Sequence, residues 1–488
     1  MEAHTEIKRR KPLTANVGLF CVGHHTYWAQ YPGLKEELLG NHDLLRRRIA
    51  GNGVSVTDFG MVDSAESAYA RVREIRSGDY DVVFCNLATY ATSATWGTMI
   101  REITAPLVLI ALQPGRATDF SRITTQQQLA NDQIVSLPEF AGVALRMGKP
   151  VPPMIVGALH EDPIAEAELA EWCRIARVLH DLRGARIGQM GHTLEAMLDM
   201  HSDHTMFTEA FGLHVAQTEI EDVLRPFRAV TREEAGAKRR FIEEFFDMPD
   251  PVTDPDTLRL SDADLEEAAR AAVALDKFIE SRRLDGLAYY YEGEEGSDVR
   301  RLVSNFIVGN SILCASGFPM CGENDLKTCV AMLIMDRLEI GGSFAEFHPI
   351  DFQHNVVYVG HDGPHHLGIC EGRPFLRSLL KYHGKPGSGA SVEFKIKHGP
   401  LTMLGIGQTH DGRFKFIIGE GESVPGPVPP TGNTNTPARF RPDPVTYIKA
   451  WCAEGPTHHF ALGVGHHGRT LQKLGAALGI ETVIVAPG

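Results

Sequence analysis

The feature that most constrains the fold is an alternation of short apolar segments with longer amphipathic ones over residues 16–160. The short segments are rich in β-branched and aromatic residues and end at Gly, Asn or Pro, as strands do. They are Val17–Val22, Val54–Phe59, Asp81–Leu87, Leu107–Leu112 and Pro153–Leu159. The intervening segments, such as Ala65–Arg76, have the period of a helix. Strands that alternate with helices predict a parallel sheet covered on both faces.

A second alternating block begins near Ala185. It contains a long helix predicted over Asp262–Arg282 and ends in another predicted over Asp325–Leu338. After Gly341-Gly342 the pattern changes to short strands and glycine-rich turns, which is typical of a barrel or a sandwich. The predicted fold is therefore α/β, with two doubly wound parallel-sheet domains followed by a mainly β, barrel-like C-terminal domain.

A chain of 488 residues is too long for a single core. The changes of pattern predict an N-terminal α/β domain over residues 1–184, a central α/β domain over residues 185–342 and a C-terminal β-rich domain over residues 343–488.

Composition excludes several classes of partner. The formal net charge of −14 disfavours nucleic acid and anionic membrane surfaces. The charged N-terminus leads into no apolar stretch of the kind that a signal peptide or a spanning helix requires. The eight cysteines are scattered and form no CxxC pair, which indicates small buried residues in a reducing compartment. We therefore expect a soluble, cytoplasmic protein.

Histidines occur in pairs and clusters, which is the first indication of chemistry. They are His24-His25, His365-His366, His458-His459 and His466-His467, with His348, His354 and His361 close to the second pair. A single histidine in such a sequence more often has a structural or surface role. Several clustered with acidic residues in glycine-rich turns favour a metal or acid–base site.

Two carboxylates stand out by their surroundings. Glu323 lies in an apolar, glycine-rich approach to a predicted helix, and Glu346 lies between Phe344 and Phe347. Each could be a solvated glutamate on a strand face, but if buried it would need a partner, because an unpaired buried charge is costly. A glutamate and histidine set without cysteine spacing suits Mn²⁺, Fe²⁺ or Co²⁺ better than a thiolate zinc site.

These residues stand in segments that resemble the L-arabinose isomerase family. Cys321-Gly322-Glu323-Asn324-Asp325-Leu326-Lys327-Thr328 is similar to a Gly-Glu-Gly-Asp-Trp-Lys-Thr stretch of that family. Gly341-Gly342-Ser343-Phe344-Ala345-Glu346 is similar to its Gly-Gly-Thr-Ser-Phe-Met-Glu stretch. Val359-Gly360-His361 looks like its Gly-Ser-His, and Thr457-His458-His459 looks like its Ala-His-His. Order and spacing agree along the C-terminal half, and weaker matches extend through most of the chain.

The resemblance implies a site and an assembly. Carried over by position, Glu323, Glu346, His361 and His459 look like the four metal ligands of the family, with Mn²⁺ as the expected ion. The two glutamates look like its catalytic acid/base pair. His458 is the alternative ligand if the alignment shifts by one position. The family further implies three domains and a homohexamer, in which active sites lie between neighbouring subunits.

The substrate pocket departs from the family. Gly23-His24-His25-Thr26-Tyr27 looks like the sugar-contact turn Ser-Gln-His-Leu-Tyr, so His24 and Tyr27 are the expected substrate contacts. His24 and Thr26 replace a Gln and a Leu, and Ala111-Leu112-Gln113-Pro114 has no counterpart of a family histidine. An aromatic residue expected beside the sugar falls near Glu292. The departures predict an isomerase with a preferred sugar other than L-arabinose.

The expected reaction is the interconversion of a monosaccharide aldose and its ketose through a cis-enediol. A divalent metal would act as Lewis acid on two neighbouring sugar oxygens, and the glutamates would move the protons. A metal-dependent sugar epimerase and an isomerase that uses a hydride shift are the enzymatic alternatives. A sugar-binding protein is the non-enzymatic alternative, because the two α/β blocks resemble periplasmic sugar-binding domains in their pattern of strands and helices.

Overall fold

The computed structural model describes residues 6–117, 119–248, 252, 260–378, 389–429 and 435–486. The chain divides into two compact units, one of residues 13–181 and the other of residues 1–12 with 182–488. The domain boundaries predicted at residues 184/185 and 342/343 stay predictions. No helix among the described residues is both long enough and apolar enough to cross a membrane.

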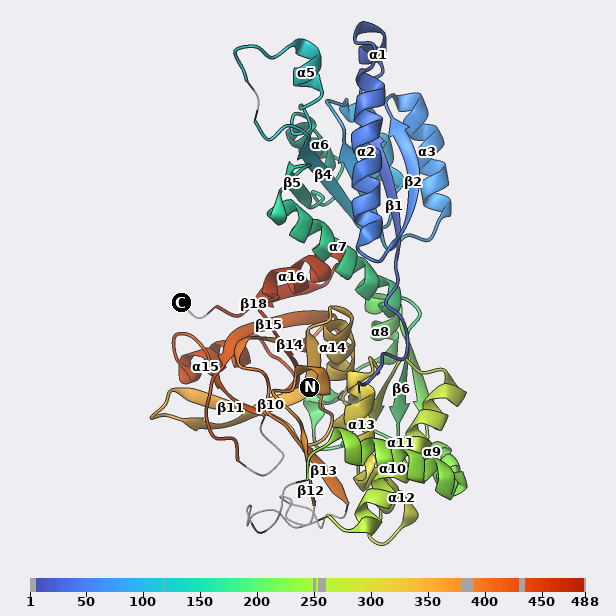
Figure 1. The fold of residues 1–488 in the computed structure, drawn as a ribbon, viewed down its shortest axis with the longest axis vertical. Coiled ribbons are helices and arrows are strands. Elements are labelled where there is room, and N and C mark those ends of the chain that lie inside the picture. Colours follow the sequence, from blue (N-terminus) through green and yellow to red (C-terminus); the bar gives the residue numbers. More distant parts are fainter. Residues whose placement is uncertain are drawn as a thin grey trace. The chain divides into compact units, whose positions relative to one another are not determined.

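The unit of residues 13–181 is built on a five-stranded parallel sheet of order β2-β1-β3-β4-β5 (Figure 1). Its strands are β1 (Asn16–Val22), β2 (Ser55–Val62), β3 (Val82–Leu87), β4 (Leu107–Gln113) and β5 (Met154–Ala158). Its helices are α1 (Thr26–Gln30), α2 (Leu34–Gly51), α3 (Ala65–Ser77), α4 (Ser93–Glu102), α5 (Thr125–Leu129), α6 (Ser136–Arg146) and α7 (Pro163–Leu182). All five predicted strands are confirmed, and the strand order is doubly wound.

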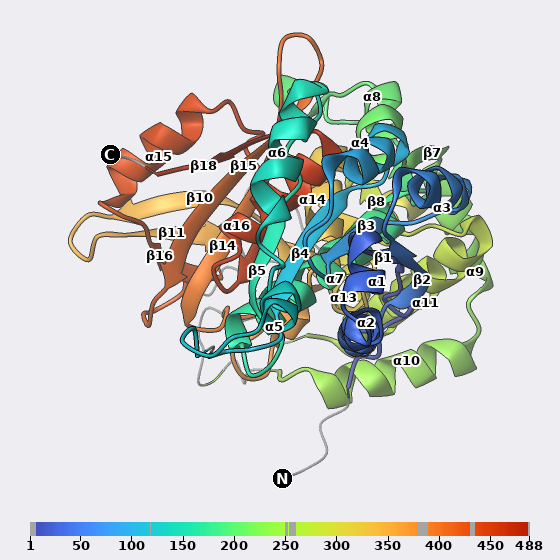
Figure 2. The same ribbon diagram turned by 90° about the horizontal axis from the view of Figure 1, so that it is seen from above.

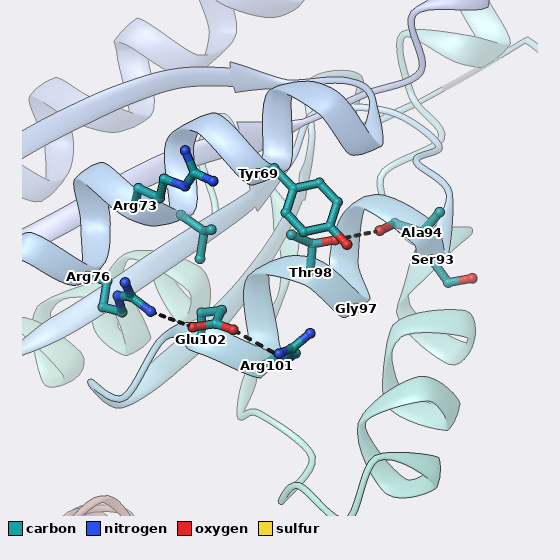
Figure 3. Close-up of a pocket in the computed structure, with 10 residues that line it drawn as sticks. Tyr69, Arg73, Arg76, Ser93, Ala94, Gly97, Thr98, Arg101 and Glu102 are labelled. Carbon is teal, nitrogen blue, oxygen red and sulfur yellow. Dashed lines mark hydrogen bonds and ion pairs between the residues drawn. The ribbon is translucent and has the colours of Figure 1, made fainter.

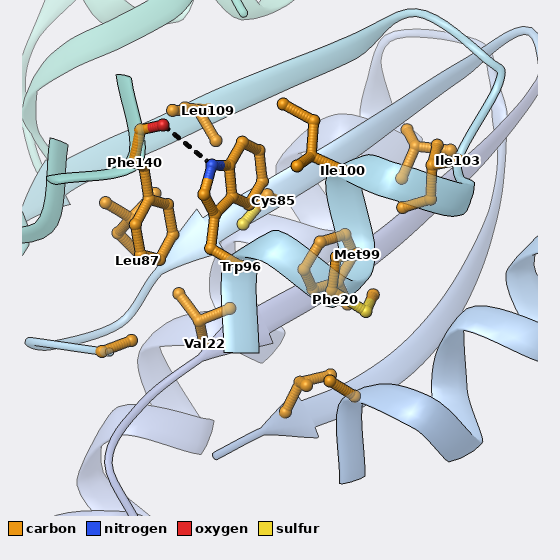
Figure 4. Packing of buried hydrophobic residues seen from close by; sticks show 14 of the residues in the cluster. Phe20, Val22, Cys85, Leu87, Trp96, Met99, Ile100, Ile103, Leu109 and Phe140 are labelled. Carbon is orange, nitrogen blue, oxygen red and sulfur yellow. Dashed lines mark hydrogen bonds between the residues drawn. The ribbon is translucent and has the colours of Figure 1, made fainter. Parts of the chain in front are cut away.

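Aromatic stacking fixes two helices of this unit against the sheet. Trp96 of α4 lies flat on Phe140 of α6, with ring centroids 4.7 Å apart and planes within 4° of parallel. The Trp96 indole N–H donates to the Phe140 carbonyl oxygen over 2.9 Å, so the buried ring leaves no donor unsatisfied. Phe20 of β1 and Cys85 of β3, two inner strands of the sheet, belong to the same buried cluster (Figure 4).

The second unit begins with a four-stranded parallel sheet of order β7-β6-β8-β9. Its strands are β6 (Arg186–Met190), β7 (His214–Thr218), β8 (Gly286–Tyr289) and β9 (Met320–Cys321). The helices are α8 (His204–Phe211), α9 (Ile220–Ala229), α10 (Arg232–Phe245), α11 (Asp262–Arg282), α12 (Asp298–Ser304), α13 (Phe306–Ala315) and α14 (Leu326–Arg337). The prediction for α11 is confirmed at both ends, and Ser261 and Asp264 form a capping box at its start.

The same unit continues into a closed antiparallel barrel (Figure 2). Six strands form the ring in the order β14-β17-β10-β11-β16-β15, and β15 pairs with β14 to close it. They are β10 (Gly341–Asp351), β11 (Val356–Gly360), β14 (Gly399–Gln408), β15 (Phe414–Ser423), β16 (Thr436–Arg439) and β17 (Phe460–Val464). Strand β18 (Glu481–Ile484) adds parallel to β15, β12 (Phe375–Ser378) pairs with β13 (Ala390–Glu393), and the helices are α15 (Pro444–Ala453) and α16 (Gly468–Leu478). The predicted barrel-like domain is confirmed.

Helix α14 connects the sheet to the barrel. It packs against β8 of the sheet and against β10, β14 and β17 of the barrel, and each of its twelve residues is buried. Its middle, residues 329–335, is apolar on every face, as expected of a helix that is covered all round. The turn that precedes α14 therefore lies where the sheet meets the barrel.

Candidate metal centre

Four separate elements present the four predicted ligands. Glu323 lies in the single turn Gly322–Asn324 between β9 and α14, and Glu346 lies in β10. His361 directly follows β11, and His459 directly precedes β17. Both of these strands pair with β10, with Glu346 opposite Gly360 and Ala345 opposite Phe460. This register brings both histidines beside Glu346.

The side chains of these four residues converge. The Nε2 atom of His361 lies 3.8 Å from Oε1 of Glu323 and 3.9 Å from Oε1 of Glu346. The Nε2 atom of His459 lies 3.6 Å from Oε2 of Glu323. The separations are too long for good hydrogen bonds. They leave space for an ion with ligand distances of about 2.0–2.2 Å after small side-chain movements.

A carboxylate lies beside the Nδ1 atom of each histidine. The Nδ1 atom of His459 lies 3.1 Å from Oδ2 of Asp325, and both side chains are fully buried. The Nδ1 atom of His361 lies 2.8 Å from Oδ1 of Asp362 and 2.8 Å from the backbone carbonyl oxygen of the same residue. When the Nδ1–H group donates a hydrogen bond to a carboxylate or a carbonyl oxygen, the Nε2 lone pair is left for a metal, which is the usual support of metal-binding histidines. Both Nε2 atoms face the glutamates.

Charge and burial favour a cation at this place. Burial alone would lower the pKa of His361, but the hydrogen bond to Asp362 and the charges of Asp362, Glu346 and Glu323 raise it to about 9. Burial lowers the pKa of His459, and the hydrogen bond that its Nδ1–H donates to Asp325 only partly opposes this. The acidic surroundings that favour a proton on His361 equally favour a bound metal ion.

Two buried atoms of the cluster lack hydrogen-bond partners among the described residues. They are Oε2 of Glu323 and Nε2 of His459, which face each other. A buried polar atom without a partner costs about 1–3 kcal/mol. An ion between the two atoms would satisfy both. Oxygen and imidazole donors without a thiolate suit a divalent ion such as Mn²⁺, so the donor set present here fits the implied metal.

The backbone at Glu323 is held in an uncommon conformation. Glu323 and Asn324 have φ values of 55° and 60°, in the left-handed region that non-glycine residues seldom adopt. The Asn324 side chain donates to the Met190 carbonyl oxygen over 2.8 Å, and Asp325 caps α14 by accepting from the Thr328 N–H. These contacts on both sides hold the turn and direct Glu323 into the cluster.

His458 also lies beside the cluster. Its Nδ1 atom is 2.6 Å from Oδ2 of Asp199, and its Nε2 atom is 4.0 Å from Oε2 of Glu323. The side chain of His458 is 35% exposed, whereas that of His459 is fully buried. His459 can combine with Glu323 and His458, or with Glu346 and His361, and in each group the ligand atoms lie within 4.8 Å of one another. His459 is favoured as the ligand because it is buried and belongs to both groups. The choice of His459 over His458 stays a prediction.

The predicted sugar contacts lie in the other unit. His24 and Tyr27 stand at the start of α1, directly beyond the carboxyl end of β1. Their rings meet edge to face with centroids 5.1 Å apart, and the ring of Tyr90 also meets that of His24 edge to face, with centroids 5.9 Å apart. Ligands of doubly wound sheets bind beyond this end of the strands, so a role at the sugar stays a prediction for both residues.

Three supporting carboxylates could not be assigned from the sequence alone. Asp362 directly follows His361, which is a weak local signal, and Asp325 stands out only as a capping residue of the predicted helix. Asp199 lies far from His458 in the chain, and no pattern in the sequence connects the two residues.

The unit of residues 13–181 also has a surface pocket of about 560 Å³ between α3 and α4 (Figure 3). Arg73, Arg76 and Arg101 line it, and Glu102 lies 2.7 Å from Arg76 and 3.2 Å from Arg101. The internal ion pairs already use much of the positive charge, and the pocket contains none of the predicted site residues.

Comparisons with known proteins find that the chain is similar to aldose–ketose isomerases. A family model described as the L-fucose isomerase C-terminal domain matches residues 376–485. The chain is 26% identical over 414 residues to an L-arabinose isomerase of Nocardioides sp., covering 81% of this chain and 78% of the relative. It is 24% identical over 410 residues to that of Acidothermus cellulolyticus, and 23% identical over 412 residues to that of Aeromonas hydrophila; each match covers 81% of this chain and 79% of the relative. The resemblance to the L-arabinose isomerase family, predicted from the motifs, is thereby confirmed.

Proposed function

We propose that this chain is a divalent-metal-dependent isomerase that interconverts an open-chain aldose and its ketose through a cis-enediol. The observation that carries the proposal is the convergence of two glutamates and two histidines, with a carboxylate on Nδ1 of each histidine. Mn²⁺ is the proposed ion, and a monosaccharide other than L-arabinose is the proposed preferred substrate. The proposed ligands are Glu323, Glu346, His361 and His459.

The two glutamates provide the acid and base of the proposed reaction. A bound divalent ion would polarise the sugar carbonyl and stabilise the negative charge that develops on the enediolate. One glutamate removes the proton from carbon 2 of the aldose, and the other transfers a proton at the carbonyl oxygen. The Glu346 side chain is 32% exposed and that of Glu323 is 14% exposed, so both can reach a sugar that enters from solvent.

The surrounding groups keep this machinery in place. Asp325 and Asp362 hold the histidine rings, so Nε2 of each ring stays directed at the glutamates. Phe344 contacts both rings, with centroids 4.4 Å from His361 and 4.3 Å from His459, while the two histidine rings themselves meet edge to face at 5.2 Å. An apolar ring at this position limits access of water to the histidines and strengthens the electrostatic interactions beside it.

We further propose a cytoplasmic homohexamer. The assembly is supported by the resemblance to the L-arabinose isomerase family. A reducing compartment is supported by the cysteines, which form no disulfide and are all buried except Cys452.

Removal and replacement of the metal tests the proposed function. Dialysis against a chelator should abolish isomerisation in a panel of aldoses, and Mn²⁺ should restore it. His361→Ala and His459→Ala should lose Mn²⁺ binding in equilibrium dialysis. The matched control His354→Ala, an exposed histidine between β10 and β11, should retain it. Full activity of protein shown by elemental analysis to be metal-free would overturn the proposal.

A further inference from the structure

A group of polar and aromatic side chains lies at the carboxyl ends of two adjacent strands of the second sheet. His192 follows β6, and Tyr290 and Glu292 follow β8. In the order β7-β6-β8-β9, the chain goes from β6 to β7 on one side and then crosses over to β8 on the other. The carboxyl ends of β6 and β8 therefore flank the topological switch point, where parallel sheets bind ligands.

Tyr290 contacts both of the other side chains. The Tyr290 N–H donates to the Met190 carbonyl oxygen over 3.0 Å, which holds the two strand ends together. The rings of His192 and Tyr290 overlap with centroids 4.2 Å apart and a tilt of 33°. The Tyr290 hydroxyl donates to Oε2 of Glu292 over 3.3 Å. Glycine is needed at position 191, where φ is +78° and a Cβ would lie 3.0 Å from Cβ of Tyr290.

The group is adjacent to the proposed metal centre. The Met190 carbonyl that accepts from Tyr290 also accepts from the side chain of Asn324, the residue after Glu323. Strands β8 and β9 are hydrogen-bonded neighbours, so the residues that follow them start about 4.8 Å apart. Tyr291 senses both places: burial raises its pKa, and the charges of Glu323 and Glu292 raise it further.

We propose that this group binds a hydroxyl group at the end of the sugar remote from the reacting carbons. The group is called here the tail subsite and consists of His192, Tyr290 and Glu292. The inference rests on the proposed function, which places carbons 1 and 2 at the metal centre. Glu292 accepts a hydrogen bond from the sugar hydroxyl, and a bond to a charged acceptor is stronger than a neutral one. The tilted rings of His192 and Tyr290 cover the apolar side of the carbon chain.

The chemistry of the tail subsite selects a class of sugar. A hydroxymethyl group on carbon 5 can donate to Glu292, whereas a methyl group or a hydrogen atom leaves the carboxylate without that partner. A uronic acid carries a negative charge to the same place and is repelled by Glu292. The preferred substrate is therefore an uncharged aldohexose, ahead of its 6-deoxy analogue and of the pentose that lacks carbon 6.

Kinetics with matched sugars test the tail subsite. D-galactose, 6-deoxy-D-galactose and L-arabinose share their configuration at carbons 2 to 4, and L-galactose, 6-deoxy-L-galactose and D-arabinose form the mirror series. In the series that the Mn²⁺-loaded enzyme turns over, kcat/KM for the hexose should exceed that for the 6-deoxy sugar at least about tenfold. Glu292→Ala should remove this preference by lowering kcat/KM for the hexose at least about tenfold more than for the 6-deoxy sugar. The exposed control Glu295→Ala should keep the preference.

Equal kcat/KM for the hexose and the 6-deoxy sugar in the unmodified enzyme would overturn the tail subsite, as would an equal loss on both sugars in Glu292→Ala. Binding of galactitol and 6-deoxygalactitol to the Mn²⁺-loaded protein, measured by calorimetry, tests the subsite without turnover. Tighter binding of galactitol that disappears in Glu292→Ala supports the subsite even if no sugar is isomerised, in which case only the proposed function fails. Equal binding of the two alditols, or no binding of either, contradicts the subsite.

Discussion

Glu323 and Glu346 each have two proposed tasks, because each carboxylate holds the ion and moves a proton. Replacement by Gln keeps the size of the side chain but removes the exchangeable carboxylate. We expect Glu323→Gln and Glu346→Gln each to lose about 10³-fold in kcat, within the range for a placed acid or base. Steady-state kinetics with saturating Mn²⁺ check this. The exposed control Glu244→Gln should keep full activity. Full activity of Glu323→Gln or of Glu346→Gln would contradict the assignment.

Solvent exchange distinguishes the two ways in which hydrogen can move between carbons 1 and 2. In an enediol mechanism the glutamate that takes the carbon-2 proton can exchange it with water. We therefore expect deuterium on carbon 1 of the ketose when the reaction is run in D₂O and the product is analysed by NMR. A hydride shift carries the hydrogen across without exchange. Product without label, together with active Gln variants, would rule out the glutamate base.

The carboxylates behind the histidines give a second prediction at this scale. Asp325→Asn keeps the shape of the side chain but removes the charge that orients His459. Loss of such a supporting carboxylate typically costs about 10–100-fold in metal affinity, and we expect a loss of this size. Competition with a metal-binding dye measures it. Asp351→Asn, a change at the far end of β10, should leave the affinity unchanged; the same loss in both variants would contradict a specific role for Asp325.

At the scale of elements, the stacked pair between α4 and α6 contributes to the stability of the unit of residues 13–181. Phe140 is fully buried against Trp96, and its truncation leaves a cavity in the core. Phe140→Ala should lower the free energy of unfolding of this unit by about 3–5 kcal/mol. Leu145→Ala, at an exposed position of the same helix, should change it by less than about 0.5 kcal/mol. Urea unfolding followed by tryptophan fluorescence measures both, and equal effects would contradict the packing argument.

For the whole molecule, we expect L-arabinose to be a poor substrate. His24 and Thr26 replace residues that the family resemblance places at the sugar, and Glu292 adds a carboxylate. Polar groups that do not match the ligand discriminate strongly against it. Comparison of kcat/KM across a panel of aldoses checks this prediction. A higher value for L-arabinose than for every other sugar would contradict it.

The proposed hexamer gives a prediction about assembly. Sedimentation should show a homo-oligomer, most consistent with six chains, and an active monomer would contradict it. If neighbouring subunits share active sites, mixed chains can form one intact site from two damaged partners. Glu323→Gln and His24→Ala chains, each inactive alone, should then regain partial activity when refolded together. Activity that does not rise above the sum of the separate variants argues against shared sites.

Much of the fold could be predicted from the sequence because helices and strands are specified locally, by the spacing of apolar residues and by the residues that end each segment. The five strands of the first sheet, helix α11 and the change to a barrel after Gly341-Gly342 all follow from such patterns. Strand order and barrel closure depend on which distant segments pair. The closing pair β14–β15 and the position of β17 between β14 and β10 therefore became known only from the tertiary structure.

For the proposed metal centre, too, some features were determined by the sequence and others only by the tertiary structure. The sequence by itself determined which residue types are available and in what order, and that was enough to nominate Glu323, Glu346, His361 and His459. Tertiary structure decided that they meet, and it decided what supports them. Asp325 and His459 are 134 residues apart, and their side chains make a hydrogen bond only because α14 packs against β17. A hydrogen bond depends on distance and angle in space, which the order of residues along a chain does not specify.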